Sequence, residues 1–146
     1  MRPAFPARPA WRRCAAIVMM KYRLGMGDYR ELLAWRRART LPGAIYRATE
    51  AFPIRERFGL AAQMRRASVS VASNIAEGAG RGSDPELRRF LRIARGSLRE
   101  LQTQITIAAD LRLIPDDCSE RLSESAAETA RLICGLLRSY DHRSRP

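Results

Sequence analysis

The chain has 146 residues, which suits a single domain that buries a modest hydrophobic core. With 46% hydrophobic and 29% charged residues, its composition is typical of a globular protein and argues against a disordered one. The formal net charge of +12 predicts an anionic partner. Nucleic acid is the leading class of partner, and a basic surface would bind an acidic protein surface equally well.

The cysteines and the apolar runs argue against several further classes. Cys14, Cys118 and Cys134 are odd in number and scattered, with no CxxC pair and no nearby histidine cluster, so neither a disulfide framework nor a zinc site is expected. Such cysteine usage favours a reducing, cytoplasmic setting. The longest apolar run, residues 14–20, is far too short to span a bilayer, so we expect no membrane partner.

Residues 1–27 differ from the rest of the chain. They contain six basic residues, no acid, and three prolines within the first nine positions. This composition predicts a basic, disordered extension. It is either an arm for nucleic acid or a segment upstream of a true start at Met19, Met20 or Met26. Residues 141–146 form a short polar tail at the other end.

A helical pattern begins at Asp28. Apolar and small residues recur at three- to four-residue spacing or its multiples: Leu32, Trp35, Ala38, Ile45, Thr49 and Phe52. Pro42 and Gly43 interrupt this helix and should kink it or split it in two. Pro53 should end it, because a residue before proline is pushed out of helical geometry.

The next stretch, QMRRASVSVASNIAEGAGR at residues 63–81, carries two competing patterns. Residues 68–73 alternate polar and apolar like a strand. A heptad spacing runs over a longer stretch: Leu60, Met64, Ala67, Val71, Asn74 and Gly78. The longer match predicts a helix whose small seam residues allow a neighbouring helix to approach closely, with a glycine-rich stop at residues 78–82.

Two more amphipathic helices follow. Ser83 and Glu86 form a capping box at the start of the third helix. Its seam is Leu87, Leu91, Ala94, Leu98, Leu101, Ile105 and Ala108. After Pro115, the seam of the fourth helix is Leu122, Ala126, Thr129, Ile133, Leu136 and Tyr140. Residues 28–140 therefore predict an all-α fold, an antiparallel up-down four-helix bundle.

Catalytic chemistry has little support in the sequence. The single histidine, His142, lies in the polar tail, and GAGRG at residues 78–82 follows a helix rather than a strand. Glu77 and Glu100 could form a carboxylate pair across two helices, but the additional Glu and His ligands of a di-iron bundle are missing. We expect no enzyme, no cofactor and no metal.

A stripe of Arg88, Arg92, Arg95 and Arg99 borders the seam of the third helix. These arginines either bind phosphates or form ion pairs within the protein with acids of the fourth helix: Asp117, Glu120, Glu124 and Glu128. Arginines with fewer acids nearby are the better phosphate candidates. The nucleic-acid-binding candidates are therefore Arg65, Arg66 and Arg81 first, then Arg88, Arg92 and Arg95.

Polar residues also accompany the seam of the second helix. One-turn spacing separates Ser70, Asn74 and Glu77. Two polar residues of the third helix, Ser97 and Glu100, could form hydrogen bonds with them. Such a network either fixes the register of the bundle, at some cost in stability, or lines a binding groove. We favour the structural interpretation.

Several of these segments resemble a known family. They are LLAWRRA (32–38), FP (52–53), FGLAAQMRRASVSVASNIAEGAGR (58–81) and RFLRIARGSLRELQTQITIAADL (89–111). Over about residues 28–140, the sequence resembles the bacterial four-helix bundle proteins known as 23S rRNA-intervening sequence proteins. Related members are accessory variability determinants of diversity-generating retroelements. Pro42 and Gly43 fall where the family usually continues its first helix.

The resemblance implies a ring-like homopentamer of bundles with a basic surface for nucleic acid and, in the retroelement branch, a reverse transcriptase partner. Two hypotheses follow. In the first, the protein is a non-catalytic, oligomeric bundle that binds RNA or DNA through phosphate contacts with low sequence specificity. In the alternative, it is a protein-interaction scaffold that docks a reverse transcriptase or another partner.

Overall fold

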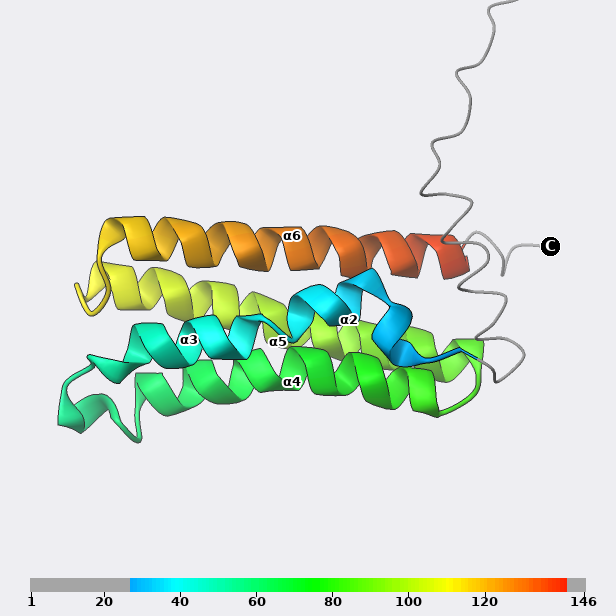
Figure 1. Ribbon diagram of the computed structural model, residues 1–146, viewed down its shortest axis with the longest axis horizontal. Helices are drawn as coiled ribbons and strands as arrows, with labels where there is room; N and C mark the ends of the chain where they lie inside the picture. The colour runs from blue at the N-terminus through cyan, green and yellow to red at the C-terminus, as the bar shows by residue number, and fades with distance from the viewer. Residues whose placement is uncertain (1–26, 142–146) are drawn as a thin grey trace, which may run out of the picture.

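The computed structural model describes residues 27–141 (Figure 1). The predictions for the basic extension, apart from Gly27, and for His142 and the other tail residues after Asp141 fall outside the described residues, and Asp141 itself is the last residue of the final helix. The described elements are η1 (Tyr29–Glu31), α2 (Leu33–Ala38), α3 (Leu41–Glu50), η2 (Ile54–Glu56), α4 (Leu60–Gly80), α5 (Asp84–Asp110) and α6 (Asp116–Asp141).

The helices form a four-helix bundle in which α2 and α3 together are the first helix. This split helix packs against α4 and α6, and α5 packs against the same two helices from the other side. Each helix runs antiparallel to the one before it (Figure 1). The described residues contain no strand, so the predicted all-α bundle is confirmed. None of their helices is long and apolar enough to cross a membrane.

The first helix breaks just before Pro42. Helix α2 ends at Ala38 and α3 begins at Leu41, which places Pro42 in the first turn of α3. Proline is tolerated there because its missing N–H has no partner in the first turn of any helix. At the break, the hydroxyl of Thr40 donates to the carbonyl oxygen of Arg37 at 2.8 Å. The predicted split is confirmed.

Residues 60–80 are helical, so the strand-like alternation at residues 68–73 does not decide the structure. The predicted seam is correct at Met64, Ala67, Val71 and Gly78, which are all buried. It is less accurate at Leu60 and at Asn74, which are only half-buried, whereas Ile75 beside Asn74 is fully buried. The buried face of a helix is about 100° wide, so Asn74 and Ile75 both adjoin it, and the apolar side chain takes the interior.

The same kind of shift occurs near the end of α6. Leu137 is buried there and Leu136 is half-buried, the reverse of the prediction. A straight helix has 3.6 residues per turn, so its buried positions drift away from a strict 3.5-residue repeat. The buried residue that follows Ile133 is therefore four positions further on, at Leu137, rather than three.

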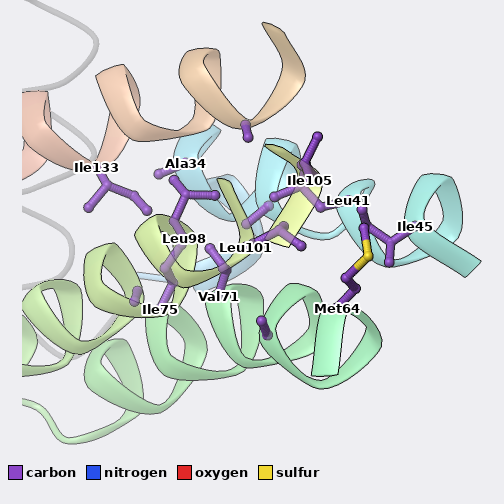
Figure 2. Close-up of a cluster of buried hydrophobic side chains, with 14 of the residues drawn as sticks. Ala34, Leu41, Ile45, Met64, Val71, Ile75, Leu98, Leu101, Ile105 and Ile133 are labelled. Atoms are coloured by element: carbon purple, nitrogen blue, oxygen red, sulfur yellow. The ribbon is translucent and has the colours of Figure 1, made fainter. Parts of the chain in front are cut away.

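The interior is built around α5. All seven seam residues of α5 are buried, as predicted. Figure 2 shows side chains from every helix converging on this seam, with Leu41, Ile45 and Met64 gathered at one end of the cluster. The burial of this continuous apolar cluster is the main stabilising contribution to the bundle.

Helices α4 and α5 approach each other closely at Gly78. A Cβ atom at this position would lie 2.6 Å from the Cβ of Phe90 and 3.3 Å from the Cα of Leu87. A Cβ atom at Gly80, two residues further along the same helix, would meet nothing within 4 Å. The small seam of α4 therefore permits the close helix contact that the sequence predicts.

Gly78→Ala should destabilise the bundle by about 1–3 kcal/mol, because the added methyl group must push α4 and α5 apart. Gly80→Ala is the matched control and should be neutral or stabilising by up to about 1 kcal/mol. Urea unfolding followed by circular dichroism measures both. Equal effects of the two substitutions would contradict the close approach at Gly78.

Candidate nucleic-acid interface

Charge is unevenly distributed along the last two helices. Four of the five arginines of α5 lie in its first half, Arg88, Arg89, Arg92 and Arg95, and the fifth, Arg99, lies just past the midpoint. The first half of α6 carries most of its acids: Asp116, Asp117, Glu120, Glu124 and Glu128. Because the two helices are antiparallel, the basic half of α5 lies beside the second half of α6, where Arg131 and Arg138 are found (Figure 1).

A groove of about 520 Å³ runs between these two halves. Four arginines line it, Arg95 and Arg99 from α5 and Arg131 and Arg138 from α6. Its remaining lining residues are mostly small or apolar: Gln102, Ala127, Ala130, Cys134, Leu137 and Asp141. Asp141 is thus the single acid among the lining residues.

Most of the groove arginines have no partner within the described part of the chain. The side chains of Arg95, Arg131 and Arg138 are exposed and make no hydrogen bond or ion pair with residues 27–141. Arg99 donates to Oε1 of Gln102 at 3.3 Å. Three cations therefore line the groove without an ion pair to any carboxylate of residues 27–141.

The arginine stripe of α5 does not pair with the acids proposed for it. Glu128 accepts from Arg37 of α2 at 2.7 Å, and Asp117 accepts from Arg121 of its own helix at 2.8 Å. Glu120 and Glu124 make no ion pair with the stripe among residues 27–141. These four acids lie in the first half of α6, alongside the second half of α5, so the antiparallel arrangement keeps them away from the stripe.

Arg88 and Arg92 meet a different acid. Their guanidinium nitrogens each lie 3.7 Å from Oδ1 of Asp141, at the end of α6. The Arg92 and Asp141 side chains are about half exposed, at 54% each, so this contact stabilises the bundle only weakly. The stripe is thus partly neutralised at the Asp141 end, whereas Arg95 has no partner within the part of the chain that the structure describes.

The first three candidate arginines lie on or beside α4, outside the groove. Nε of Arg65 donates to the hydroxyl of Thr49 at 2.9 Å, and its guanidinium lies 4.6 Å from the ring centroid of Tyr46. Arg65 therefore ties α4 to α3. Arg66 is exposed and has no partner among the described residues.

Arg81, which directly follows α4, pairs with Glu77 at 2.6 Å. This hydrogen bond, reinforced by the attraction between the two charges, raises the pKa of the Arg81 guanidinium, so Arg81 remains protonated. The guanidinium also lies 5.4 Å from the ring centroid of Phe90. The six candidates thus do not form one surface, and only Arg95 of the six lines the groove.

The sequence prediction missed Arg131 and Arg138 and left Arg99 out of the candidates. A signal for them was present. Once an antiparallel bundle is predicted, aligning the start of the third helix with the end of the fourth places these arginines together.

Three of the five proposed network residues meet between α4 and α5. The hydroxyls of Ser70 and Ser97 share a hydrogen bond of 2.9 Å across the two helices. Nδ2 of Asn74 donates to the carbonyl oxygen of Ser70 at 2.8 Å and to its hydroxyl at 3.0 Å. This half-buried cluster links the helices at one register.

The two carboxylates proposed for the network lie outside it. Glu77 binds Arg81, and Oε1 of Glu100 accepts from Gln104 of its own helix at 3.0 Å. Both side chains are exposed. Within residues 27–141, no group of three or more His, Cys, Asp or Glu side chains is placed to hold a metal ion.

A comparison with protein-family models matches residues 30–135 to the family described as 23S rRNA-intervening sequence protein. The chain belongs to this family. The match covers α3, α4 and α5 completely and includes Arg95, Arg99 and Arg131 of the groove. The predicted resemblance to the 23S rRNA-intervening sequence proteins is therefore confirmed. No curated protein matches the sequence.

Replacing Ser70 and Ser97 by alanine, singly and together, should give a coupling free energy of about 0.5–1.5 kcal/mol, because one half-buried hydroxyl loses its partner in each single variant. Ser73→Ala on the exposed side of α4 is the control, with an expected change within about 0.5 kcal/mol. Chemical denaturation of the four proteins of the cycle measures the coupling. Strictly additive effects would mean that the two hydroxyls do not interact.

Proposed function

We propose that this protein is a non-catalytic, oligomeric, basic four-helix bundle that binds RNA or DNA through phosphate contacts with low sequence specificity. The groove between α5 and α6 is the contact surface. The observation that carries this proposal is the set of three arginines, Arg95, Arg131 and Arg138, that line one groove with a single acid and have no partner among residues 27–141.

The chemistry of the groove suits phosphate. A guanidinium is always charged, is planar, and can donate two parallel hydrogen bonds to phosphate oxygens. Because Arg95, Arg131 and Arg138 have no partner among the described residues, binding a phosphate breaks no existing ion pair there. Phosphate contacts carry no sequence information, which is the physical basis for the low specificity.

The family name supports RNA as the first ligand to test, because it refers to ribosomal RNA. The uneven charge of α5 and α6 supports a polyanionic ligand in general. It concentrates positive potential at one end of the bundle, although residues 27–141 carry a net charge of only +4. A local concentration of charge steers a polyanion more effectively than the same charge spread evenly over the surface.

Self-association is part of the proposal. Ile93 and Ile107 recur at two-heptad spacing on α5 and are each 41% exposed, and Leu111, just beyond the helix, is 60% exposed. A row of exposed apolar side chains along one helix supports an interface with a second copy. The ring of five implied by the resemblance would bring several grooves to one nucleic acid and raise the affinity through avidity.

The affinity of the protein for a single-stranded RNA should fall steeply as the salt concentration rises. The triple variant Arg95→Ala, Arg131→Ala, Arg138→Ala should have a slope of log K against log salt that is smaller by about 2, because each lost phosphate contact removes about 0.7. Fluorescence anisotropy across a salt series measures this slope. The matched control is Arg121→Ala on the same helix, whose side chain is 71% exposed and already paired with Asp117. Its slope should match that of the parent protein.

A salt response that is flat for the parent protein would contradict the proposal and favour the docking of a protein partner. A steep response that the triple variant retains would show that phosphates bind elsewhere. Circular dichroism of the triple variant verifies that it is folded, as expected for three exposed positions.

Ile93→Glu together with Ile107→Glu should lower the mass of the assembly, because two charges would be buried without partners at the proposed interface. Sedimentation velocity measures the mass. Leu33→Glu is the control, since Leu33 is 62% exposed on a different helix. An unchanged assembly, or a parent protein that is monomeric, would contradict an interface on this face of α5.

A further inference from the structure

The loop that joins α3 to α4 presents two apolar side chains to solvent. Ile54 is 85% exposed and Phe58 is 86% exposed, the highest values among the large hydrophobic residues of the described chain. Large apolar side chains at this level of exposure call for an explanation when they belong to an ordered element.

The loop has a fixed backbone. The η2 turn is closed by hydrogen bonds from the amide of Glu56 to the carbonyl of Pro53 at 2.8 Å and from Arg57 to Ile54 at 3.1 Å. Phe52 anchors the start of the loop in the core, and the carboxylate of Glu56 accepts from the first amide of α4, that of Leu60, at 3.3 Å. The exposed side chains are therefore held outward by a structured loop.

Helices α3 and α4 and the loop between them form a hairpin, and each exposed aromatic ring of this α3–α4 hairpin has a guanidinium group over it. The Cζ atom of Arg57 lies 5.5 Å from the ring centroid of Phe58. The Cζ atom of Arg65 lies 4.6 Å from the centroid of Tyr46, whose side chain is half exposed, and Thr49 holds Arg65 in place. Each of the two exposed rings thus lies beside one guanidinium group.

We propose that the α3–α4 hairpin stacks unpaired bases of a single-stranded nucleic acid, with Phe58 as the principal platform and Tyr46 as the second. This inference rests on the proposed nucleic-acid binding and adds a preference for unpaired strands. Base stacking on aromatic side chains tolerates any sequence, because every base has a π-face. The bases of a duplex are stacked on one another and offer no such face.

The local charge favours a nucleic acid as the occupant. Residues 47–66 contain five arginines and two glutamates. One of those glutamates, Glu56, is engaged at the start of α4. Between the two exposed apolar residues of the loop, Ile54 and Phe58, the sequence IRERF places three consecutive charged residues, a composition that is depleted at the core of protein–protein interfaces. Stacking needs only one ring at a time, with arginines beside it for the flanking phosphates.

The test uses three ligands with strands of about 12 nucleotides each. They are a mixed-sequence single-stranded RNA, an abasic single strand of the same length, and the duplex of that RNA with its complement, and each variant is compared with the parent protein on the same ligand. Phe58→Ala should weaken binding of the single-stranded RNA about tenfold, because a stacking contact is lost. Binding of the duplex and the abasic strand should not change, and neither should the salt slope, because no phosphate contact is removed.

Two further variants make the test specific. Leu33→Ala removes an exposed apolar side chain elsewhere and should leave all three affinities unchanged. Phe58→Trp should keep the affinity for single-stranded RNA. It should also add a fluorescence signal, relative to the parent protein, that the single-stranded RNA quenches and the abasic strand does not.

The outcomes separate this inference from the proposed function. If Phe58→Ala binds single-stranded RNA normally while the triple groove variant does not, stacking at the hairpin is overturned and the groove stands. Equal losses for RNA, duplex and abasic strand would also overturn it. Unchanged RNA affinity with a reduced assembly mass would assign the loop to a second copy of the chain. If the parent protein binds none of the ligands, the proposed function and this inference both fail.

Discussion

Burial of the α5 seam determines the arrangement of the other features. Leu91, Leu98 and Ile105 are completely buried, so the rotation of α5 about its axis is fixed by their need to avoid water. That rotation points Ser97 toward Ser70 of α4 on one side and turns Arg95 and Arg99 toward α6 on the other. The polar cluster and the basic groove are therefore consequences of the same hydrophobic stripe, and changing the seam would displace both.

The helices and the break at Pro42 were predictable because each rests on a local signal that no tertiary contact opposes. The α5 seam was predictable in full because its apolar residues follow a regular repeat. Asn74 and Leu136 were misplaced for a different reason. Spacing alone defines a face to within about one residue, and the choice between neighbours such as Asn74 and Ile75 depends on which side chain gains more from leaving water.

The candidate site was harder to predict because it belongs to two helices at once. Arg131 and Arg138 look unremarkable along α6, and they become important only beside the arginines of α5. Conversely, the sequence suggests that Arg65 is available to bind phosphate, whereas in the structure its guanidinium group donates a hydrogen bond to Thr49 and lies over the ring of Tyr46, both in α3. Charge alone does not distinguish these cases, since the difference lies in which carboxylates, hydroxyls and rings the tertiary fold brings within reach of each guanidinium.

The proposed groove and hairpin differ in how they respond to the solvent, and this difference decides what each contributes. Phosphate contacts gain most of their free energy from the release of counterions, so their contribution shrinks as salt increases. Stacking of a base on Phe58 depends on contact between two planar surfaces and is far less sensitive to salt. At low salt the groove would dominate and single and double strands would bind alike. As salt approaches physiological levels, the hairpin would contribute a growing share, and preference for unpaired strands would increase even as total affinity falls.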